Sequence, residues 1–124
     1  MQNAELYRRG IVLPLDDDAE KRLRANDVTQ NTSIWLQEIP SQQLFETLCQ
    51  LGLFQNINKR CSTLINDYEE EMVETSLVKE ILAAVESVAL DAEAQQPDIV
   101  EFLGSFRALV QEACRVSRPL LFVL

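Results

Sequence analysis

Two long stretches of the chain repeat their apolar residues every three or four positions, the spacing of an amphipathic α-helix. The clearer stretch runs from Asp98 to Ser117, with Pro97 placed as a first-turn proline and Pro119 placed to end the helix. Its apolar positions are Ile99, Phe102, Leu103, Phe106, Leu109, Val110, Ala113 and Cys114. The stretch from Ser76 to Ala94 has a wider apolar face, which is typical of a central helix.

Shorter helical patterns occupy the first half of the chain. Ser41 is placed to cap a helix that Gly52 ends, and a second pattern runs from about Asn56 toward Met72. The apolar positions of that second pattern are Ile57, Cys61, Leu64 and Ile65, followed by Tyr68. A weaker helix is predicted for residues 16–26, capped by aspartates, and a polar loop is predicted for residues 26–33.

Two apolar segments near the chain ends do not follow a helical pattern. Ile11 to Leu15 and Leu120 to Leu124 are short, rich in strand formers and adjacent to prolines. They either pair as a two-stranded β ribbon lying on the helices or pack on them as separate extended arms. We therefore predict an all-α fold, a compact bundle of about five helices with or without this ribbon. Residues 1–124 form one domain, with 1–15 as an extended arm and 118–124 as an apolar tail.

Composition limits where such a protein works. The apolar run after Arg9 is too short for a signal peptide and leads into Asp16, and no apolar stretch approaches the roughly 20 residues that span a bilayer. The three cysteines, Cys49, Cys61 and Cys114, include no CxxC pair and fall among apolar residues, as expected for reduced core thiols. We expect a soluble cytoplasmic protein without a bound metal.

The negative charge is concentrated in one segment. From Asp67 to Glu101 the chain has eleven carboxylates and a single basic residue, Lys79, whereas the rest is nearly balanced; the formal net charge of the chain is −9. The carboxylates are Asp67, Glu69, Glu70, Glu71, Glu74, Glu80, Glu86, Asp91, Glu93, Asp98 and Glu101. Such a field repels nucleic acid and anionic membranes and attracts basic protein surfaces.

Several classes of chemistry are excluded by missing residue types. The chain has no histidine, which rules out Ser-His, Cys-His and HExxH constellations. Its three glycines are isolated from one another, so neither a P-loop nor a Rossmann turn is present. No cofactor is expected.

One arrangement of carboxylates suggests magnesium. If helical, Glu71 and Glu74 lie one turn apart on one face, as do Asp98 and Glu101, so two facing helices could offer four carboxylates to the ion. The pattern Glu70-Glu71-x-x-Glu74 with Asp98-x-x-Glu101 resembles the EExxE and ExxD motifs of the all-α nucleoside triphosphate pyrophosphohydrolases, with the second motif reversed. The resemblance implies a Mg²⁺-dependent enzyme of that kind.

Two apolar features allow a partner as well as a core role. Trp35, the only tryptophan, lies between Ile34 and Leu36 and serves either the core or an interface as an anchor. The apolar tail must be covered either by its own chain or by a second copy in a homodimer.

These observations favour a non-catalytic, acidic protein-binding module. Its most specific form is an inhibitor or immunity-type protein that places an anionic helical face on a basic partner such as a toxin or nuclease. The expected partner-binding residues are Asp67, Glu70, Glu71, Glu74, Glu80 and Trp35. The alternatives are the pyrophosphohydrolase-like enzyme and a homodimeric scaffold or adaptor.

Overall fold

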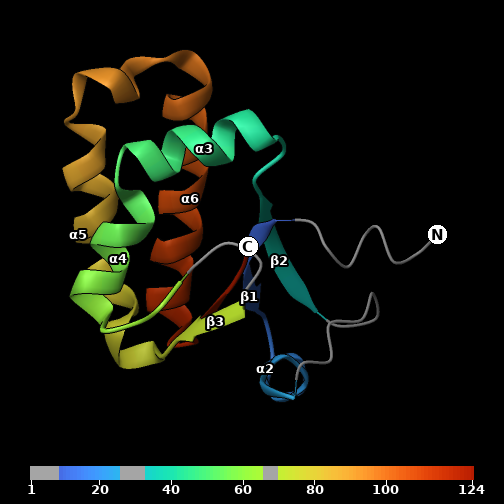
Figure 1. Ribbon diagram of the computed structural model, residues 1–124. Helices are drawn as coiled ribbons and strands as arrows, with labels where there is room; N and C mark the ends of the chain where they lie inside the picture. The colour runs from blue at the N-terminus through green and yellow to red at the C-terminus, as the bar shows by residue number, and fades with distance from the viewer. Residues whose placement is uncertain (1–8, 26–32, 66–69) are drawn as a thin grey trace.

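The protein is a mixed α and β structure in which helices cover one face of a four-stranded antiparallel sheet (Figure 1). The computed structural model describes residues 9–25, 33–65 and 70–124. The prediction of an all-α bundle is therefore wrong. The helices are present, but the segments that separate them form a sheet.

The sheet has the strand order β2-β1-β4-β3. Its strands are β1 (Gly10–Pro14), β2 (Ile34–Glu38), β3 (Glu70–Val73) and β4 (Leu120–Val123). The segments predicted as extended arms supply β1 and β4, which pair directly, with Ile11 opposite Phe122. They are not an isolated ribbon, because β2 adds to the outer side of β1 and β3 to the outer side of β4. Every residue of β1 is buried accordingly.

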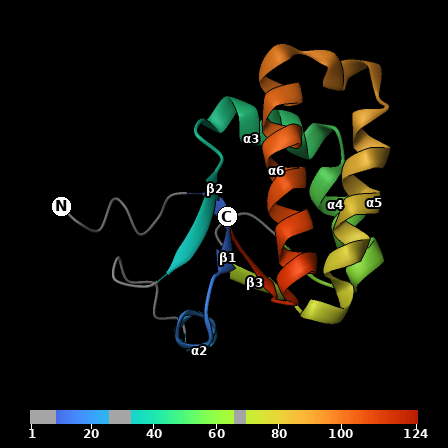
Figure 2. The ribbon, with the colours of Figure 1, turned by 180° about the vertical axis from the view of Figure 1, so that it is seen from behind.

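Five α-helices are found in the described part of the chain. They are α2 (Asp17–Arg24), α3 (Gln42–Gln50), α4 (Leu53–Cys61), α5 (Val78–Ala89) and α6 (Pro97–Val116), with 3-10 turns η1 (Thr75–Leu77) before α5 and η2 (Ala92–Gln95) after it. Both views show α3 to α6 on one side of the sheet and α2 apart from them (Figures 1 and 2). None of these helices is both long enough and apolar enough to cross a bilayer.

The helix predictions from periodicity are confirmed for α3 and α6. The helix predicted from Ser76 to Ala94 is present as α5 but ends at Ala89, and the turn η2 follows it. The Ser41 hydroxyl accepts a hydrogen bond from the Leu44 amide at the start of α3, as a capping serine should. The apolar stripe of α6 is buried from Ile99 to Ala113. In the centre of the core, the Phe122 ring of β4 meets the Phe106 ring of α6 edge to face, with ring centroids 6.1 Å apart.

The helix predicted from about Asn56 toward Met72 is only half right. The helix α4 ends at Cys61, because Ser62 adopts the left-handed conformation with a φ of 56°. Leu64, predicted to face the core, is 77% exposed. The chain then returns as β3, which pairs with β4. Residues 66–69 lie outside the described ranges, as do residues 26–32 of the predicted polar loop.

The second strand missed by the sequence prediction is β2. Ile34 to Glu38 pair with β1 in continuous antiparallel register, from Pro14 opposite Ile34 to Gly10 opposite Glu38. This strand places Trp35 at an edge of the sheet. The apolar tail, in contrast, is buried within its own chain, since Leu120, Leu121 and Phe122 are all shielded from solvent.

The cysteines differ in their surroundings. Cys61 is buried in the core and Cys49 is half-buried, but Cys114 on α6 is exposed, so the expectation of three core thiols is wrong for Cys114. All three are free thiols.

Candidate functional site

The carboxylates of the acidic segment do not form one continuous platform. Glu70, Glu71, Glu74 and Glu80 lie on β3 and at the beginning of α5, whereas Asp98 and its neighbours lie at the start of α6 (Figure 1). The two helices run antiparallel, and the 12 residues of α5 span about 18 Å. Salt screens exposed charges over about 8 Å at physiological ionic strength. The two groups of acids therefore act on a partner separately.

Glu70 and Glu71 point to opposite faces of the sheet. Neighbouring side chains on a strand alternate, and residues opposite each other on paired strands share a face. Glu71 is opposite Phe122, which is buried under the helices, while Glu70 is opposite Val123 on the other face. Of the two, Glu70 is exposed and Glu71 is half-buried. The two glutamates thus cannot present their charges to one surface together.

Glu74 already forms an ion pair with Arg24 of its own chain. Its carboxylate accepts two hydrogen bonds from Arg24 of α2, at 3.0 Å from Nη1 and 2.9 Å from Nη2. These hydrogen bonds hold the pKa of Glu74 below its usual range and raise the pKa of Arg24. Glu74 is a structural residue at this corner, and its charge is largely compensated.

The remaining predicted acids are spread further. Glu80 is half-buried in the first turn of α5, where its charge contributes to raising the pKa of the Cys61 thiol. Asp67 lies outside the described residues. Of the acids predicted to bind a partner, Glu70 is the one that is exposed and has no ion pair in the described parts of the chain.

Trp35 lies far from these glutamates. It is on β2, at the edge of the sheet opposite to β3, so three strand intervals of about 4.8 Å separate the two strands. Its side chain is half-buried and packs against the helix-covered core. Trp35 and Glu70 consequently face opposite sides of the sheet and do not form one site.

The carboxylate pairs that resemble pyrophosphohydrolase motifs are not brought together. Glu70 and Glu71 are on a strand, not a helix, and Asp98 and Glu101 begin α6 at the far end of the helical pair (Figure 1). Within residues 9–25, 33–65 and 70–124, no group of three or more metal-binding side chains is found. The helical geometry on which the resemblance depends is therefore absent from this fold.

The face of the sheet turned away from α3 to α6 carries a continuous apolar row across all four strands. The row consists of Leu36, Val12, Leu121 and Met72 in that order. We call this side the outer face. Its two central residues, Val12 and Leu121, are buried together with Leu23 of α2. The row is only partly covered, since Leu36 remains 40% exposed.

Two carboxylates flank the next row of the outer face. From edge to edge this row reads Glu38, Gly10, Val123 and Glu70. Gly10 leaves space for its neighbour, because a Cβ there would lie 2.7 Å from Cδ1 of Leu36. The outer face is therefore apolar in its middle and carries a glutamate at each edge, away from the end where α2 follows Pro14.

Sequence reasoning missed the outer face because it missed the sheet. Ile34, Trp35 and Leu36 form a short run of strand formers between a polar stretch and Pro40, which is an ordinary strand signal. That signal identifies β2, but only the pairing with β1 shows that Leu36 and Trp35 point to opposite faces.

Comparisons with known protein families, with curated proteins and with solved structures find no match to this chain.

Proposed function

We propose that the protein is a non-catalytic binding module that uses the outer face of its sheet to hold a basic, amphipathic segment of a partner protein. The observation that carries this proposal is the apolar row across four strands, exposed at Leu36 and accompanied by the exposed Glu70. Partly exposed apolar rows with polar borders are typical of protein interfaces. The occupant's chemistry follows from Glu70 and from the net charge of −9, because an exposed carboxylate on an acidic protein complements lysine or arginine.

The charge of the whole molecule supports the same kind of partner. A net charge of −9 on 124 residues steers cationic proteins toward it and speeds their capture. The proposal takes its most specific form as an inhibitor or immunity-type protein that covers a cationic surface of a toxin or nuclease. The acids at the far end of α5 and α6 contribute to steering in this view but not to the contact.

The proposed contact differs from the one expected from sequence alone. Glu70 is retained as a contact residue. Leu36 takes the anchoring role predicted for Trp35, because Leu36 is an exposed large apolar side chain on the outer face. Glu71 and Glu74 are not assigned to the contact. The homodimeric alternative loses its proposed surface, since the apolar tail is the inner strand β4.

Differential capture tests this proposal. The wild-type protein and a Leu36→Ser, Glu70→Lys double variant are immobilised and exposed to lysate of the source cell at low salt. The matched control is Leu90→Ser, Glu101→Lys, which makes the same changes at exposed positions outside the outer face. We expect a basic protein to be retained by the wild type and the control, to be released as salt rises, and to be lost from the double variant.

The kinetics of the captured partner separate the two roles. Removing the Glu70 charge should mainly slow association, and truncating Leu36 should mainly speed dissociation. Equal retention by the wild type and the double variant would show that the outer face is not the contact. Loss of retention in the control alone would assign the contact to the region where α5 ends and α6 begins. That result would also contradict the proposal.

A further inference from the structure

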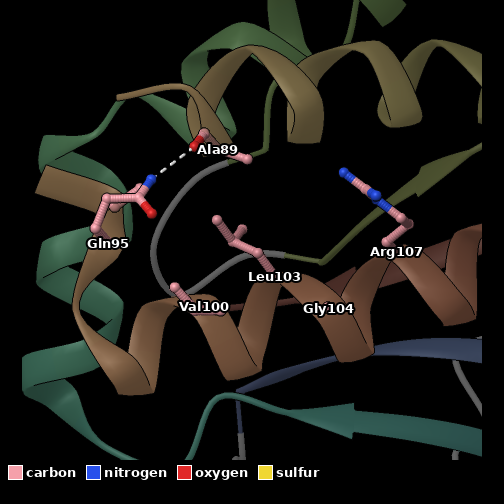
Figure 3. Close-up of a pocket in the computed structure, with 7 residues that line it drawn as sticks. Ala89, Gln95, Val100, Leu103, Gly104 and Arg107 are labelled. Carbon is pink, nitrogen blue, oxygen red and sulfur yellow. Dashed lines mark hydrogen bonds between the residues drawn. The ribbon is translucent and has the colours of Figure 1, made fainter. Parts of the chain in front are cut away.

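The helices α5 and α6 form a pocket that is separate from the outer face. A pocket of about 260 Å³ lies between the end of α5, the turn η2 and the first half of α6. Its lining residues are Ala89, Ala94, Gln95, Val100, Leu103, Gly104 and Arg107. In Figure 3, Gln95 and Arg107 stand at opposite ends of the pocket, with Val100 and Leu103 between them. The pocket is thus apolar along its length and polar at its ends.

The polar ends differ in how well their groups are satisfied. The Gln95 amide donates hydrogen bonds to the carbonyl oxygens of Ala89, at 3.0 Å, and Asp91. The Nε of Arg107 is buried, and among the described residues it has no hydrogen-bond partner. Because Nε is closed to solvent while the side chain as a whole is 42% exposed, a bound acceptor oxygen reaches the guanidinium through its outer Nη groups.

The nearest carboxylate does not satisfy Arg107. Glu86 of α5 is 3.7 Å from Nη2, longer than an ordinary hydrogen bond, and both side chains are largely exposed. Arg107 is also the only basic residue between Lys79 and Arg115. A single cation therefore lies at the end of a pocket whose other lining residues are uncharged.

Gly104 leaves the floor of the pocket bare. A Cβ at this position would meet no atom within 4 Å, so close packing does not require glycine here. Glycine inside a helix is unfavourable compared with alanine. Its structural effect is to leave the space between Leu103 and Arg107 open.

We propose that this pocket binds a small aliphatic carboxylic acid. The carboxylate accepts hydrogen bonds from the Arg107 Nη groups, and the branched apolar body lies over Gly104 and Leu103 toward Ala94. The volume is just below the roughly 300–1,000 Å³ of common ligand pockets, which favours a small acid over a nucleotide or a long lipid. A charge-assisted hydrogen bond to arginine fixes the orientation. This site is independent of the proposed partner contact on the outer face.

The test is a titration of the ¹⁵N-labelled full chain with isocaproate, followed by amide chemical shifts. A ligand this small should bind in the millimolar range. We expect saturable shifts confined to the end of α5, η2 and the first half of α6. Isocaproamide, which lacks the charge, and acetate, which lacks the apolar body, should each bind at least about tenfold more weakly.

Matched variants assign the binding to the pocket. Gly104→Leu fills the pocket and should abolish the shifts, whereas Ser105→Leu adds the same side chain at the next, exposed position and should leave binding unchanged. Arg107→Gln should weaken binding about tenfold and covers the case in which the leucine variant does not fold. Glu86→Gln should strengthen binding about threefold, because it removes a competing carboxylate.

The titration tests the proposed carboxylic acid site without requiring the partner protein. Absence of saturable shifts with the wild type would overturn it, as would equal binding of isocaproate and isocaproamide. Unchanged binding to Arg107→Gln would place the acid elsewhere and equally contradict it. The Leu36→Ser, Glu70→Lys variant should bind isocaproate normally, so that failure of one proposal is distinguishable from failure of the other.

Discussion

Arg24 and Glu74, fifty residues apart, form a bidentate ion pair that links α2 to the segment between β3 and α5. Arg24 also donates to Glu20 on its own helix, and Glu20 accepts a further hydrogen bond from Arg118 at 3.1 Å. Arg118 precedes β4 and also pairs with Asp17. This charged network joins α2 to the end of β3 and to the start of β4, and Leu23 of α2 adds apolar contact with Val12 and Leu121.

The Glu74→Gln variant should lose stability in a pH-dependent way. The pKa of Glu74 is lowered in the folded protein by the Arg24 hydrogen bonds, so its stabilising effect is present above the unfolded-state pKa, roughly 4.3, and is lost as pH falls through the folded pKa. Because the pair is about half exposed, we expect a cost of only about 0.5–1 kcal/mol at neutral pH. Urea unfolding of both proteins across the acid range measures this difference.

The control for this experiment is Glu101→Gln, which removes an exposed carboxylate from α6. It should leave the unfolding free energy within about 0.5 kcal/mol of the wild type. If the deficit of Glu74→Gln persisted unchanged at acid pH, the effect would come from packing and not from the ion pair.

Two glycines should respond to alanine in opposite directions. Gly104→Ala should raise the unfolding free energy by about 0.5–1 kcal/mol, since alanine favours a helix interior and its Cβ meets no atom within 4 Å. Gly10→Ala should lower it by about 1–3 kcal/mol, because the added Cβ would lie 2.7 Å from Leu36 Cδ1 and 2.9 Å from the Gln37 carbonyl oxygen. Denaturant melts of the pair provide the measurement, and a shift of the same sign in both would contradict the packing described here.

The helical layer and the two end strands could be predicted from local pattern, and the four-stranded sheet could not. The stripes of α5 and α6 and the Ser41 cap of α3 are local signals, and each marks a helix in the structure. The segments of β1 and β4 are rich in strand formers, and their pairing is one of two predicted arrangements. The addition of β2 and β3 depends on contacts between distant residues, which the sequence pattern does not show.

The error at β3 has a specific cause. The apolar spacing through Ile57 and Cys61 continues to Leu64 and Ile65, so periodicity alone extends α4 past its true end. Ser62, in the left-handed conformation, ends the helix instead, and the Asn58 side chain closes the turn by accepting the Ile65 amide hydrogen at 2.7 Å. Without that turn, Glu70 and Glu71 were assigned to a helix, and the predicted anionic face followed from this assignment.

Removal of the apolar tail should unfold the protein and not merely change its oligomeric state. A chain ending at Pro119 lacks β4, which pairs with β1 on one side and β3 on the other. We expect far-ultraviolet circular dichroism to show loss of cooperative melting. A folded, stable truncated monomer would contradict the central position of β4.

A point variant tests the contribution of β4 to stability without removing the strand. Phe122 is fully buried, and its ring meets the Phe54 and Phe106 rings edge to face. Phe122→Ala should cost about 3–5 kcal/mol of unfolding free energy. Leu90→Ala, at a position that is 87% exposed, should change the unfolding free energy by no more than about 0.5 kcal/mol.

The thiols provide a measure of opening that does not depend on the ligand or the partner. Burial raises the pKa of the Cys61 thiol, the nearby Glu80 raises it further, and the thiol contacts the Leu77 carbonyl oxygen at 3.6 Å. Cys61 is therefore both protonated at neutral pH and shielded, whereas Cys114 is exposed. In a Cys49→Ala background, a thiol reagent should modify Cys114 in the native state and Cys61 only after unfolding, as peptide mass spectrometry can show. Cys114→Ser should then remove the fast phase alone. Rapid native modification of Cys61 would mean that α4 separates from α5 without global unfolding, because this thiol contacts the Leu77 carbonyl oxygen at the start of α5.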